Sequence, residues 1–369
     1  SHLKFILLTE NLTVTRILVF KNSFKYSKKK KFYYDSKKID KFLKIQISKI
    51  NNHYEIHKLS FIAHGSACFY LDKKNLINDG YHFSSNFNQN LFFRKYKPKF
   101  SETFTPDLNK LHNLGKNFFL IKNKNEDFKF MTLPSYLGWS FSGNNFIDTS
   151  YLGCHTYLWN FKKKKFSSLI KKLNGLKNMP KILKSGKFIG YANNSSFKIS
   201  KNCKIYNGLH DTSSSFNFHK NFFNYKNSIF LSTGTTFIFG HYINDKFKLK
   251  HSEGFYHMCG INKSNKILCK KFDGGILYKK NQSKIIEKKI AEISVNHINS
   301  ILKKIKKEKI NIVIDGPFSK NKKFISFLKI SKNLNIFCSK SEYIPSLGAA
   351  FLFKKKSVKL YRDNFYLKF

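Results

Sequence analysis

The stretch SIFLSTGTTFIFGHY, residues 228–242, places two apolar runs on either side of a Ser-Thr-Gly-Thr turn. Alternating apolar residues interrupted by a short turn with Gly predict a β-hairpin. Further along the chain we expect a long amphipathic helix over about 283–307, two buried strands, and a helix that starts among small residues. These two strands are INIVIDG (310–316) and NLNIFCS (333–339), and the helix starts in SLGAAFLF (346–353). Strands that alternate with helices predict an α/β fold.

The first sixty residues show a related order. Three short apolar runs come first, apolar positions between Ile39 and Ile47 then recur at near-helical spacing, and KLSFIA (58–63) follows as a buried strand. The three runs are LKFILL (3–8), TRILVF (15–20) and KKFYY (30–34). Three antiparallel strands, a helix and a parallel strand form the order of a ribonuclease-H-like core. The sequence therefore predicts an α/β protein of two related lobes.

Length and charge bound the possible classes of protein. A chain of 369 residues is long enough for two cores, and residues 73–180, rich in Asn and Phe, are expected to be mostly helices and loops. There are 69 Lys and Arg against 21 Asp and Glu, a formal charge of +48, which would attract nucleic acid or an anionic membrane. The lysines are spread along the whole chain, which favours a solvated surface over a nucleic-acid site.

The cysteines and the apolar runs bear on the cellular compartment of the protein. Six cysteines are widely scattered without a C-x-x-C pair, which fits neither a zinc site nor a compact disulfide framework. Reduced thiols are typical of a cytoplasmic protein. No apolar run approaches the ~20 residues needed to cross a bilayer, and no signal-peptide pattern opens the chain, so no membrane partner is expected.

The stretch NGLHDTSSSFN (207–217) is unusual in this chain because it has hydroxyl residues but no lysine. One interpretation is a loop or helix cap that solvates itself. The other is a carboxylate, Asp211, that accepts a proton beside His210. Local pattern alone leaves both interpretations open.

Seven motifs in order resemble the FGGY family of carbohydrate kinases, most closely its rhamnulokinase-like branch, over nearly the whole chain. They are HGSACFYLD (64–72), LPSYLGWSFSG (133–143), TSYLGCHTYLW (149–159), GLHDTSSS (208–215), LSTGTT (231–236), VIDGPFSKN (313–321) and LGAAFL (347–352).

The resemblance implies an actin-like ATPase fold of two ribonuclease-H-like lobes with a cleft between them. Residues 1–206 would form a sugar-binding lobe and residues 207–369 a nucleotide-binding lobe. The implied reaction is ATP- and magnesium-dependent phosphorylation of a sugar hydroxyl, with Asp211 as the general base.

The resemblance also implies the binding residues. His64, Gly65 and His210 would bind the sugar. Nucleotide contacts are expected from Thr13, Arg16, Thr233, Gly234, Thr235, Gly316, Asn321 and Gly348. No metal role follows for the Cys154–His155 pair, because no further ligands lie at a suitable spacing.

The first hairpin departs from the family pattern. Thr9 stands where the family has an Asp that helps hold magnesium, and Asn11 stands where it has a Gly. Thr13 still offers a hydroxyl, whereas strand alternation is expected to point Glu10 away from Thr9. Loss of such a carboxylate could cost several kcal/mol of transition-state stabilisation.

A second departure is Asp315-Gly316 in place of Gly-Gly, which brings a negative charge near the nucleotide unless the Asp315 side chain turns outward. Three hypotheses follow from these features. They are an active sugar kinase, a weakened or inactive relative that still binds sugar or nucleotide, and a basic protein that binds nucleic acid.

Overall fold

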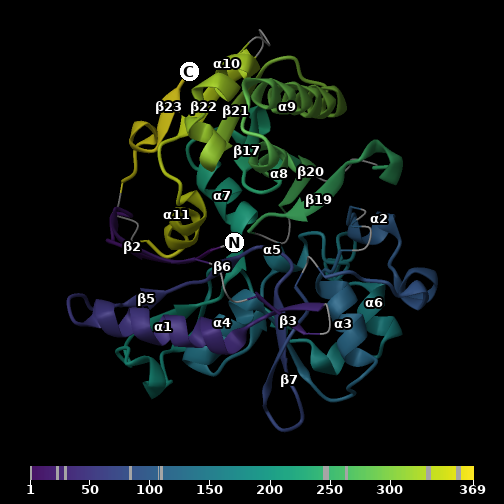
Figure 1. The fold of residues 1–369 in the computed structure, drawn as a ribbon, viewed down its shortest axis with the longest axis vertical. Helices are drawn as coiled ribbons and strands as arrows, with labels where there is room; N and C mark the ends of the chain where they lie inside the picture. The colour runs from purple at the N-terminus through teal and green to yellow at the C-terminus, as the bar shows by residue number, and fades with distance from the viewer. Residues whose placement is uncertain are drawn as a thin grey trace. The chain divides into compact units, whose positions relative to one another are not determined.

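The computed structural model describes residues 2–21, 25–28, 31–82, 85–106, 108, 111–243, 249–261, 265–329, 334–354 and 359–369 (Figure 1). The chain forms two compact units. The N-terminal unit comprises Ser1–Asp211 with Ile261–Lys263, and the C-terminal unit comprises Thr212–Gly260 with Ser264–Phe369. The sequence placed a boundary between residues 206 and 207, and the structure divides the chain between residues 211 and 212.

The C-terminal unit is built on one sheet with the strand order β19-β20-β18-β17-β21-β22-β23. These strands are β17 (Ser228–Thr233), β18 (Phe237–Ile243), β19 (Tyr256–Cys259), β20 (Lys266–Phe272), β21 (Ile310–Asp315), β22 (Leu334–Ser339) and β23 (Tyr366–Lys368). Strands β17, β18 and β20 pair antiparallel, and β21 and β22 continue the sheet in parallel with β17. The hairpin and the two later strands that the sequence predicted are therefore confirmed, and the structure adds that these two strands are parallel.

Helices cover both faces of this sheet (Figure 1). They are α7 (Asp211–His219), α8 (Gly274–Lys280), α9 (Lys284–Ile305), α10 (Lys322–Lys329) and α11 (Ile344–Phe351). On β18, the ring of Phe239 meets His297 of α9, whereas Phe216 of α7 lies directly over Gly240. Because successive strand residues face opposite sides, α9 and α7 lie on opposite faces.

The N-terminal unit contains several small sheets instead of one large sheet. They have the strand orders β1-β2, β3-β4, β14-β15-β5, β16-β6, β8-β7-β9, β10-β13 and β11-β12. The first strands are β1 (His2–Leu8), β2 (Val14–Lys21), β3 (Lys25–Lys28), β4 (Lys31–Tyr34), β5 (Lys58–Leu59), β6 (Ile62–Ala63), β7 (Cys68–Leu71) and β8 (Ile77–Asp79). The others are β9 (Lys129–Thr132), β10 (Phe146–Ile147), β11 (Trp159–Asn160), β12 (Lys165–Phe166), β13 (Lys181–Ile182), β14 (Phe188–Tyr191), β15 (Lys204–Tyr206) and β16 (Leu209–His210).

The helix α4 (Leu133–Ser142) joins these small sheets into one core. It contacts β6, β7, β9, β10, β14 and β15, and every residue in it except Trp139 is buried. Thr132 caps its first turn, Pro134 occupies that turn, and Gly143 ends the helix with a positive φ of 75°. The other helices of this unit are α1 (Ser36–Asn51), α2 (Phe100–Thr103), α3 (Leu114–Lys122), α5 (Thr149–Leu152) and α6 (Ser168–Lys172).

Two predictions about the N-terminal unit need correction. KLSFIA forms two strands, β5 and β6, which pair with different partners, because the chain leaves one sheet and enters another between Leu59 and Ile62. The three runs expected as antiparallel neighbours lie in two sheets, because β1 pairs with β2 whereas KKFYY becomes β4 and pairs with β3. The region 73–180 is mostly helices and loops, as expected, with a few short strands such as β9, which pairs with β7.

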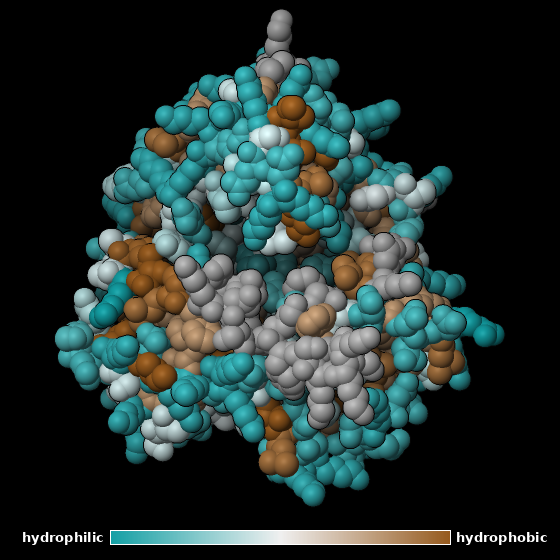
Figure 2. Space-filling view, in the orientation of Figure 1, coloured by the Kyte–Doolittle hydropathy of each residue, from teal (hydrophilic) through white to brown (hydrophobic). Residues whose placement is uncertain are grey.

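The visible surface is largely hydrophilic (Figure 2), as expected for lysines that are spread along the whole chain. Hydrophilic residues cover much of the face in Figure 2, and brown apolar residues are scattered among them. Among the described helices, none has the length and apolar character that a membrane span requires.

Candidate active site

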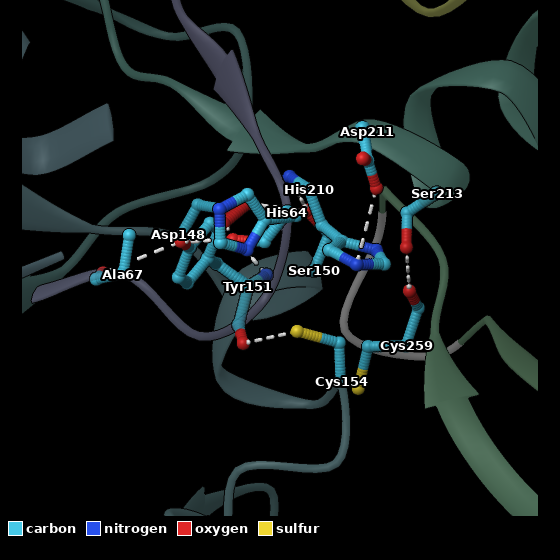
Figure 3. A network of polar contacts seen from close by, with 10 residues as sticks. All are labelled: His64, Ala67, Asp148, Ser150, Tyr151, Cys154, His210, Asp211, Ser213 and Cys259. Carbon is cyan, nitrogen blue, oxygen red and sulfur yellow. Dashed lines mark hydrogen bonds and ion pairs between the residues drawn. The ribbon is translucent and has the colours of Figure 1, made fainter. Parts of the chain in front are cut away.

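Two parallel strands of the N-terminal unit bring the predicted sugar-side residues together. Strands β6 and β16 pair so that Ala63 lies opposite His210. His64 and Asp211 each follow directly after one of these paired residues, at the carboxyl ends of the strands (Figure 3). Carboxyl ends of parallel strands are where α/β proteins commonly bind ligands.

Asp211 presents a partly exposed carboxylate beside a buried imidazole. Its Oδ1 lies 3.3 Å from Nε2 of His210, and the side chains are 39% and 2% exposed. Burial lowers the pKa of His210, and the charge of Asp211 opposes that shift. A neutral imidazole therefore stands next to a carboxylate that solvent or a ligand can reach.

His64 is held on two sides by tyrosines. The hydroxyl of Tyr34 lies 3.2 Å from Nε2 of His64, and the hydroxyl of Tyr151 donates a hydrogen bond to the His64 carbonyl. Burial lowers the pKa of His64, partly offset by the charge of Asp211. The same cause raises the pKa of Tyr151, so its hydroxyl keeps the proton that it donates. Sequence reasoning missed both tyrosines, because nothing in their local pattern ties them to residue 64.

Gly65 allows close packing behind His64. A Cβ at this position would lie 2.5 Å from Sγ of Cys154 and 3.1 Å from the His155 ring. The ring of His155 also stands 6.2 Å from that of His210, nearly perpendicular to it. The structure therefore brings His64, Gly65, His210 and Asp211 together, with the Cys154–His155 pair beside them.

A buried carboxylate that sequence reasoning missed lies under this cluster. Asp148 is only 3% exposed, and it accepts hydrogen bonds from Ser150, Tyr151 and Ser185. Burial raises its pKa to about 6. Asp148 directly precedes α5 as its N-cap, a signal readable from the sequence, but the contact with Ser185 is not.

In the C-terminal unit, the turn between β17 and β18 holds three of the predicted nucleotide residues. Thr233 is fully buried, and its hydroxyl donates to the carbonyl of Asp315 and accepts from the N–H of Phe318 at 3.1 Å. The Thr233 hydroxyl is therefore engaged inside the unit, and a phosphate contact by Thr233 stays a prediction. Gly234 and Thr235 are exposed.

Gly275, which sequence reasoning missed, packs against this turn. A Cβ on Gly275 would lie 2.2 Å from the carbonyl oxygen of Gly234 and 3.0 Å from Cα of Thr235. The N–H of Ile276 donates to the Thr235 carbonyl at 3.3 Å. The turn is therefore held by the start of α8, and only a residue without a side chain fits there.

Asp315 turns into the core of the C-terminal unit. Its Oδ2 lies 2.8 Å from Nε2 of His219, whose Nδ1 lies 2.7 Å from the hydroxyl of Tyr366. Asp315 and His219 are both almost completely buried. The expectation that Asp315 could keep its charge from the nucleotide only by turning outward is wrong, since the carboxylate is buried and paired instead.

Gly316 follows with a backbone that favours glycine. Its φ is 81°, and a Cβ would lie 2.8 Å from the Thr233 carbonyl oxygen. Asn321 serves the protein itself, because its Oδ1 accepts from the N–H of Phe324 and its Nδ2 donates to Glu287 at 2.8 Å. Gly348 of α11 lies directly against α7, where a Cβ would stand 2.2 Å from the Ser214 carbonyl oxygen.

The first hairpin is closed by its own threonines. The N–H of Thr9 donates to the Thr13 carbonyl at 3.0 Å, and the N–H of Thr13 donates to the Thr9 hydroxyl at 3.2 Å. Thr13 and Arg16 are exposed. Glu10 lies in the turn and not in a strand, so the alternation expected to direct its side chain does not apply there.

Solved structures with the same fold are carbohydrate kinases. A carbohydrate kinase from Novosphingobium aromaticivorans matches with a TM-score of 0.81 and 16% identity, over 95% of this chain and 90% of that one. A ligand-bound xylulose kinase from Lactobacillus acidophilus and a Plasmodium falciparum glycerol kinase with ADP each match with a TM-score of 0.77 and 14% identity, over 95% of this chain and 86% of theirs.

No protein-family profile matches the sequence, and no curated protein is similar to it in sequence. The fold comparison confirms the predicted class: the chain has the two-lobed α/β fold of the actin-like ATPases, in the form found in sugar kinases.

Proposed function

We propose that this protein is an ATP-dependent carbohydrate kinase that transfers the γ-phosphate to a sugar hydroxyl, with Asp211 as the general base. The observation that carries the proposal is the cluster at the ends of β6 and β16, where Asp211 stands beside His210 and next to His64. The fold shared with sugar kinases supports the same function. The finer assignment, to the rhamnulokinase-like branch of the FGGY family, rests on the sequence motifs.

Phosphoryl transfer to a sugar hydroxyl requires one group that accepts the proton and a site that aligns the hydroxyl with the γ-phosphate. As the oxygen of the sugar hydroxyl attacks the γ-phosphorus, its proton passes to the Asp211 carboxylate, and ADP leaves with the electrons of the broken P–O bond. His64 and His210 are neutral because burial lowers the pKa of each, so they can hydrogen-bond sugar hydroxyls as donor or acceptor. Gly65 leaves room for the Cys154 and His155 side chains behind His64.

The nucleotide side is proposed for the C-terminal unit. There Gly234 and Thr235 would offer backbone N–H groups and one hydroxyl to the phosphates. Gly316 and Gly348 would contribute through close backbone packing, against Thr233 and Ser214 respectively. The Thr233 and Asn321 side chains would support the nucleotide site indirectly, because they hydrogen-bond the backbone N–H groups of Phe318 and Phe324 and so fix the local backbone. Thr13 and Arg16 are proposed as further phosphate contacts from the first hairpin.

Magnesium is implied by this fold family, and the described side chains do not fit a protein-held ion. Among the residues that the structure describes, no three Asp, Glu, His or Cys side chains gather as metal ligands. The first hairpin has Thr9 in place of the usual Asp, and the Thr9 hydroxyl accepts a hydrogen bond from Thr13. Magnesium is therefore expected to arrive bound to the ATP phosphates, as part of the substrate.

The test is a panel of neutral sugars and polyols with ATP and magnesium, read by ADP release and by ³¹P NMR of the product. At least one sugar should be phosphorylated in a stoichiometric reaction. Release of ADP without a phosphorylated sugar, or no reaction with any sugar, would contradict the proposal.

A weakened relative that binds sugar without turnover is the second candidate, favoured by the missing carboxylate at Thr9. It predicts that sugars raise the melting temperature while no product forms. Binding of nucleic acid is a third possibility, for which the +48 charge is the only support; it predicts affinity that falls steeply with salt and no response to sugar. We further propose a cytoplasmic location, supported by six cysteines that are all buried thiols.

A further inference from the structure

The one-turn helix α5 contacts both strand ends that carry the candidate sugar-binding residues (Figure 3). The Tyr151 hydroxyl donates to the carbonyl of His64, at the end of β6. The Ser150 Oγ accepts from the backbone N–H of His210, at the end of β16, with a distance of 3.1 Å. Two neighbouring residues of one short helix therefore hold the backbones of both histidines.

Both of these residues are held by Asp148. Its Oδ1 accepts from the N–H of Tyr151 at 2.8 Å, and its Oδ2 accepts from the hydroxyl of Ser150 at 2.5 Å. A second hydroxyl, from Ser185, also donates to Oδ2 at 2.9 Å. Since a Ser hydroxyl has one proton and two lone pairs, Ser150 can donate to Asp148 and accept from His210 at the same time.

Helix capping explains only part of this arrangement. A cap needs one carboxylate oxygen on a first-turn N–H, which is the bond from Tyr151 to Oδ1. The other oxygen accepts hydrogen bonds from two buried hydroxyls, and one of these hydroxyls also accepts from the N–H of His210, the residue before Asp211. Burial of a carboxylate costs free energy, and capping a single helical turn does not require a buried one.

We propose that Asp148 is a positioning residue, which acts through Ser150 and Tyr151 to fix the backbones of His210 and His64 and thereby the place of the Asp211 carboxylate. The proposal rests on the function proposed above. Its physical reason is that phosphoryl transfer depends on the alignment of base and hydroxyl, so that small displacements of the base cost turnover. Asp148 itself is buried and reaches the sugar side only through these two residues.

The chain offers a matched pair of variants for the test. Ser150→Ala and Ser185→Ala each remove one hydroxyl from Oδ2 of Asp148, and both serines are buried. Of the two serines, only Ser150 also accepts a hydrogen bond from the backbone N–H of His210. We expect a larger fall in melting temperature for Ser150→Ala, which also leaves the His210 N–H without its acceptor. At a temperature where both variants are folded, we expect a fall of about tenfold or more in kcat/KM for Ser150→Ala and a change within about twofold for Ser185→Ala. Equal kcat/KM values in the two variants would overturn the proposal.

Amide hydrogen exchange tests the link without turnover. The N–H of His210 should exchange faster in Ser150→Ala than in Ser185→Ala or wild type, because only that variant loses its acceptor. Equal exchange in the two variants would overturn the proposal even if the kinase is active. If wild type phosphorylates no sugar, the proposed function fails, and exchange in Asp148→Ala still tests the positioning role: the His210 N–H should exchange faster than in wild type, and equal exchange would overturn it.

A second variant covers the case that Ser150→Ala does not fold. Tyr151→Phe removes the hydroxyl that donates to the His64 carbonyl but keeps the backbone bond to Asp148. It should raise KM for the sugar severalfold with a smaller effect on kcat, since His64 is a binding residue and not the base. An unchanged KM would contradict the part of the proposal that concerns His64.

Discussion

The candidate residues of the two units use their side chains differently. In the N-terminal unit, the Asp211 carboxylate reaches the surface with 39% of its side chain exposed, beside the buried ring of His210. In the C-terminal unit, the predicted Thr233 and the unusual Asp315 are buried and bonded within the unit, and Gly234 and Thr235 are what remains at the surface. Sugar recognition is therefore proposed to depend on side chains, and nucleotide recognition mainly on backbone shape.

The same kind of motif residue therefore has opposite uses in the two units. A hydroxyl or carboxylate beside a turn suggests ligand binding when only the sequence is read. In the C-terminal unit these groups hold the turn itself, as the Thr233 hydroxyl does between Asp315 and Phe318. Substitutions should separate the two uses, because a ligand contact affects activity and an internal contact affects folding.

The largest effect on stability is expected from Asp315→Ala. The variant leaves His219 buried without its carboxylate partner, and loss of one member of a buried pair typically costs about 3–5 kcal/mol. Asp273→Ala is the matched control, since Asp273 also precedes a glycine but is exposed, and its carboxylate accepts from the Thr236 hydroxyl at the surface. It should cost under about 0.5 kcal/mol in urea denaturation. Equal losses would show that burial does not separate these two aspartates.

The next effect concerns the pH dependence of Asp148. Its pKa is raised from 3.8 to about 6 by burial, so the folded state holds a proton that the unfolded state has already released. This contribution to stability is fully present below about pH 4 and is lost as the pH rises through about 6. Wild type should therefore lose about 3 kcal/mol relative to Asp148→Asn over this range, from the shift of about two units. Parallel stability curves for the two proteins, measured by urea denaturation at each pH, would contradict this assignment.

A third prediction compares two glycines that both have a positive φ. Gly316 has φ 81° and ψ −169°, a combination open essentially only to glycine, whereas Gly254 has φ 67° and ψ 10°, in the left-handed helical region. Of the two, only Gly316 would bring a Cβ against a neighbour, the Thr233 carbonyl oxygen at 2.8 Å. Gly316→Ala should cost about 2–3 kcal/mol, from the glycine-only backbone and the crowding together. Gly254→Ala should cost about 1 kcal/mol from the backbone alone. If thermal unfolding shifts both variants equally, the shape of the Gly316 turn is not set by Thr233.

The smallest effect separates the threonines of the two hairpins. Thr233→Val leaves the buried N–H of Phe318 without its acceptor and should cost about 2 kcal/mol. Thr9→Val removes an exposed hydrogen bond and should change stability by less than about 0.5 kcal/mol. Chemical denaturation of both variants measures the difference, and a Thr9→Val loss as large as that of Thr233→Val would show that the first turn is equally dependent on its hydroxyl.

Elements with strong local patterns could be predicted from the sequence. The hairpin over 228–242 is β17 and β18, and the helix expected over 283–307 is α9, Lys284–Ile305. Apolar periodicity decides such elements, because one face must be buried whatever the partner is. Weakly periodic stretches such as 73–180 depend on partners from elsewhere, which explains why strands in that region were missed.

The candidate site divides in the same way. Asp211 was singled out because its stretch has hydroxyl residues and no lysine, and both Asp211 and His64 follow the motif order of the family that the sequence resembles. The burial of Asp315 could not be predicted, since its partner His219 lies 96 residues away in the chain and Tyr366 lies 147 residues from His219. Asp148 shows both cases, with a local capping signal and a Ser185 contact that only the fold creates.

Asp211→Asn decides whether Asp211 accepts the proton of the sugar hydroxyl, when turnover and sugar binding are measured on the same samples. Asparagine keeps the size of the side chain but cannot act as the base. We expect kcat to fall by at least ~10²-fold while the sugar dissociation constant from calorimetry stays within about threefold. A kcat within twofold of wild type, with sugar binding intact, would contradict this role of Asp211.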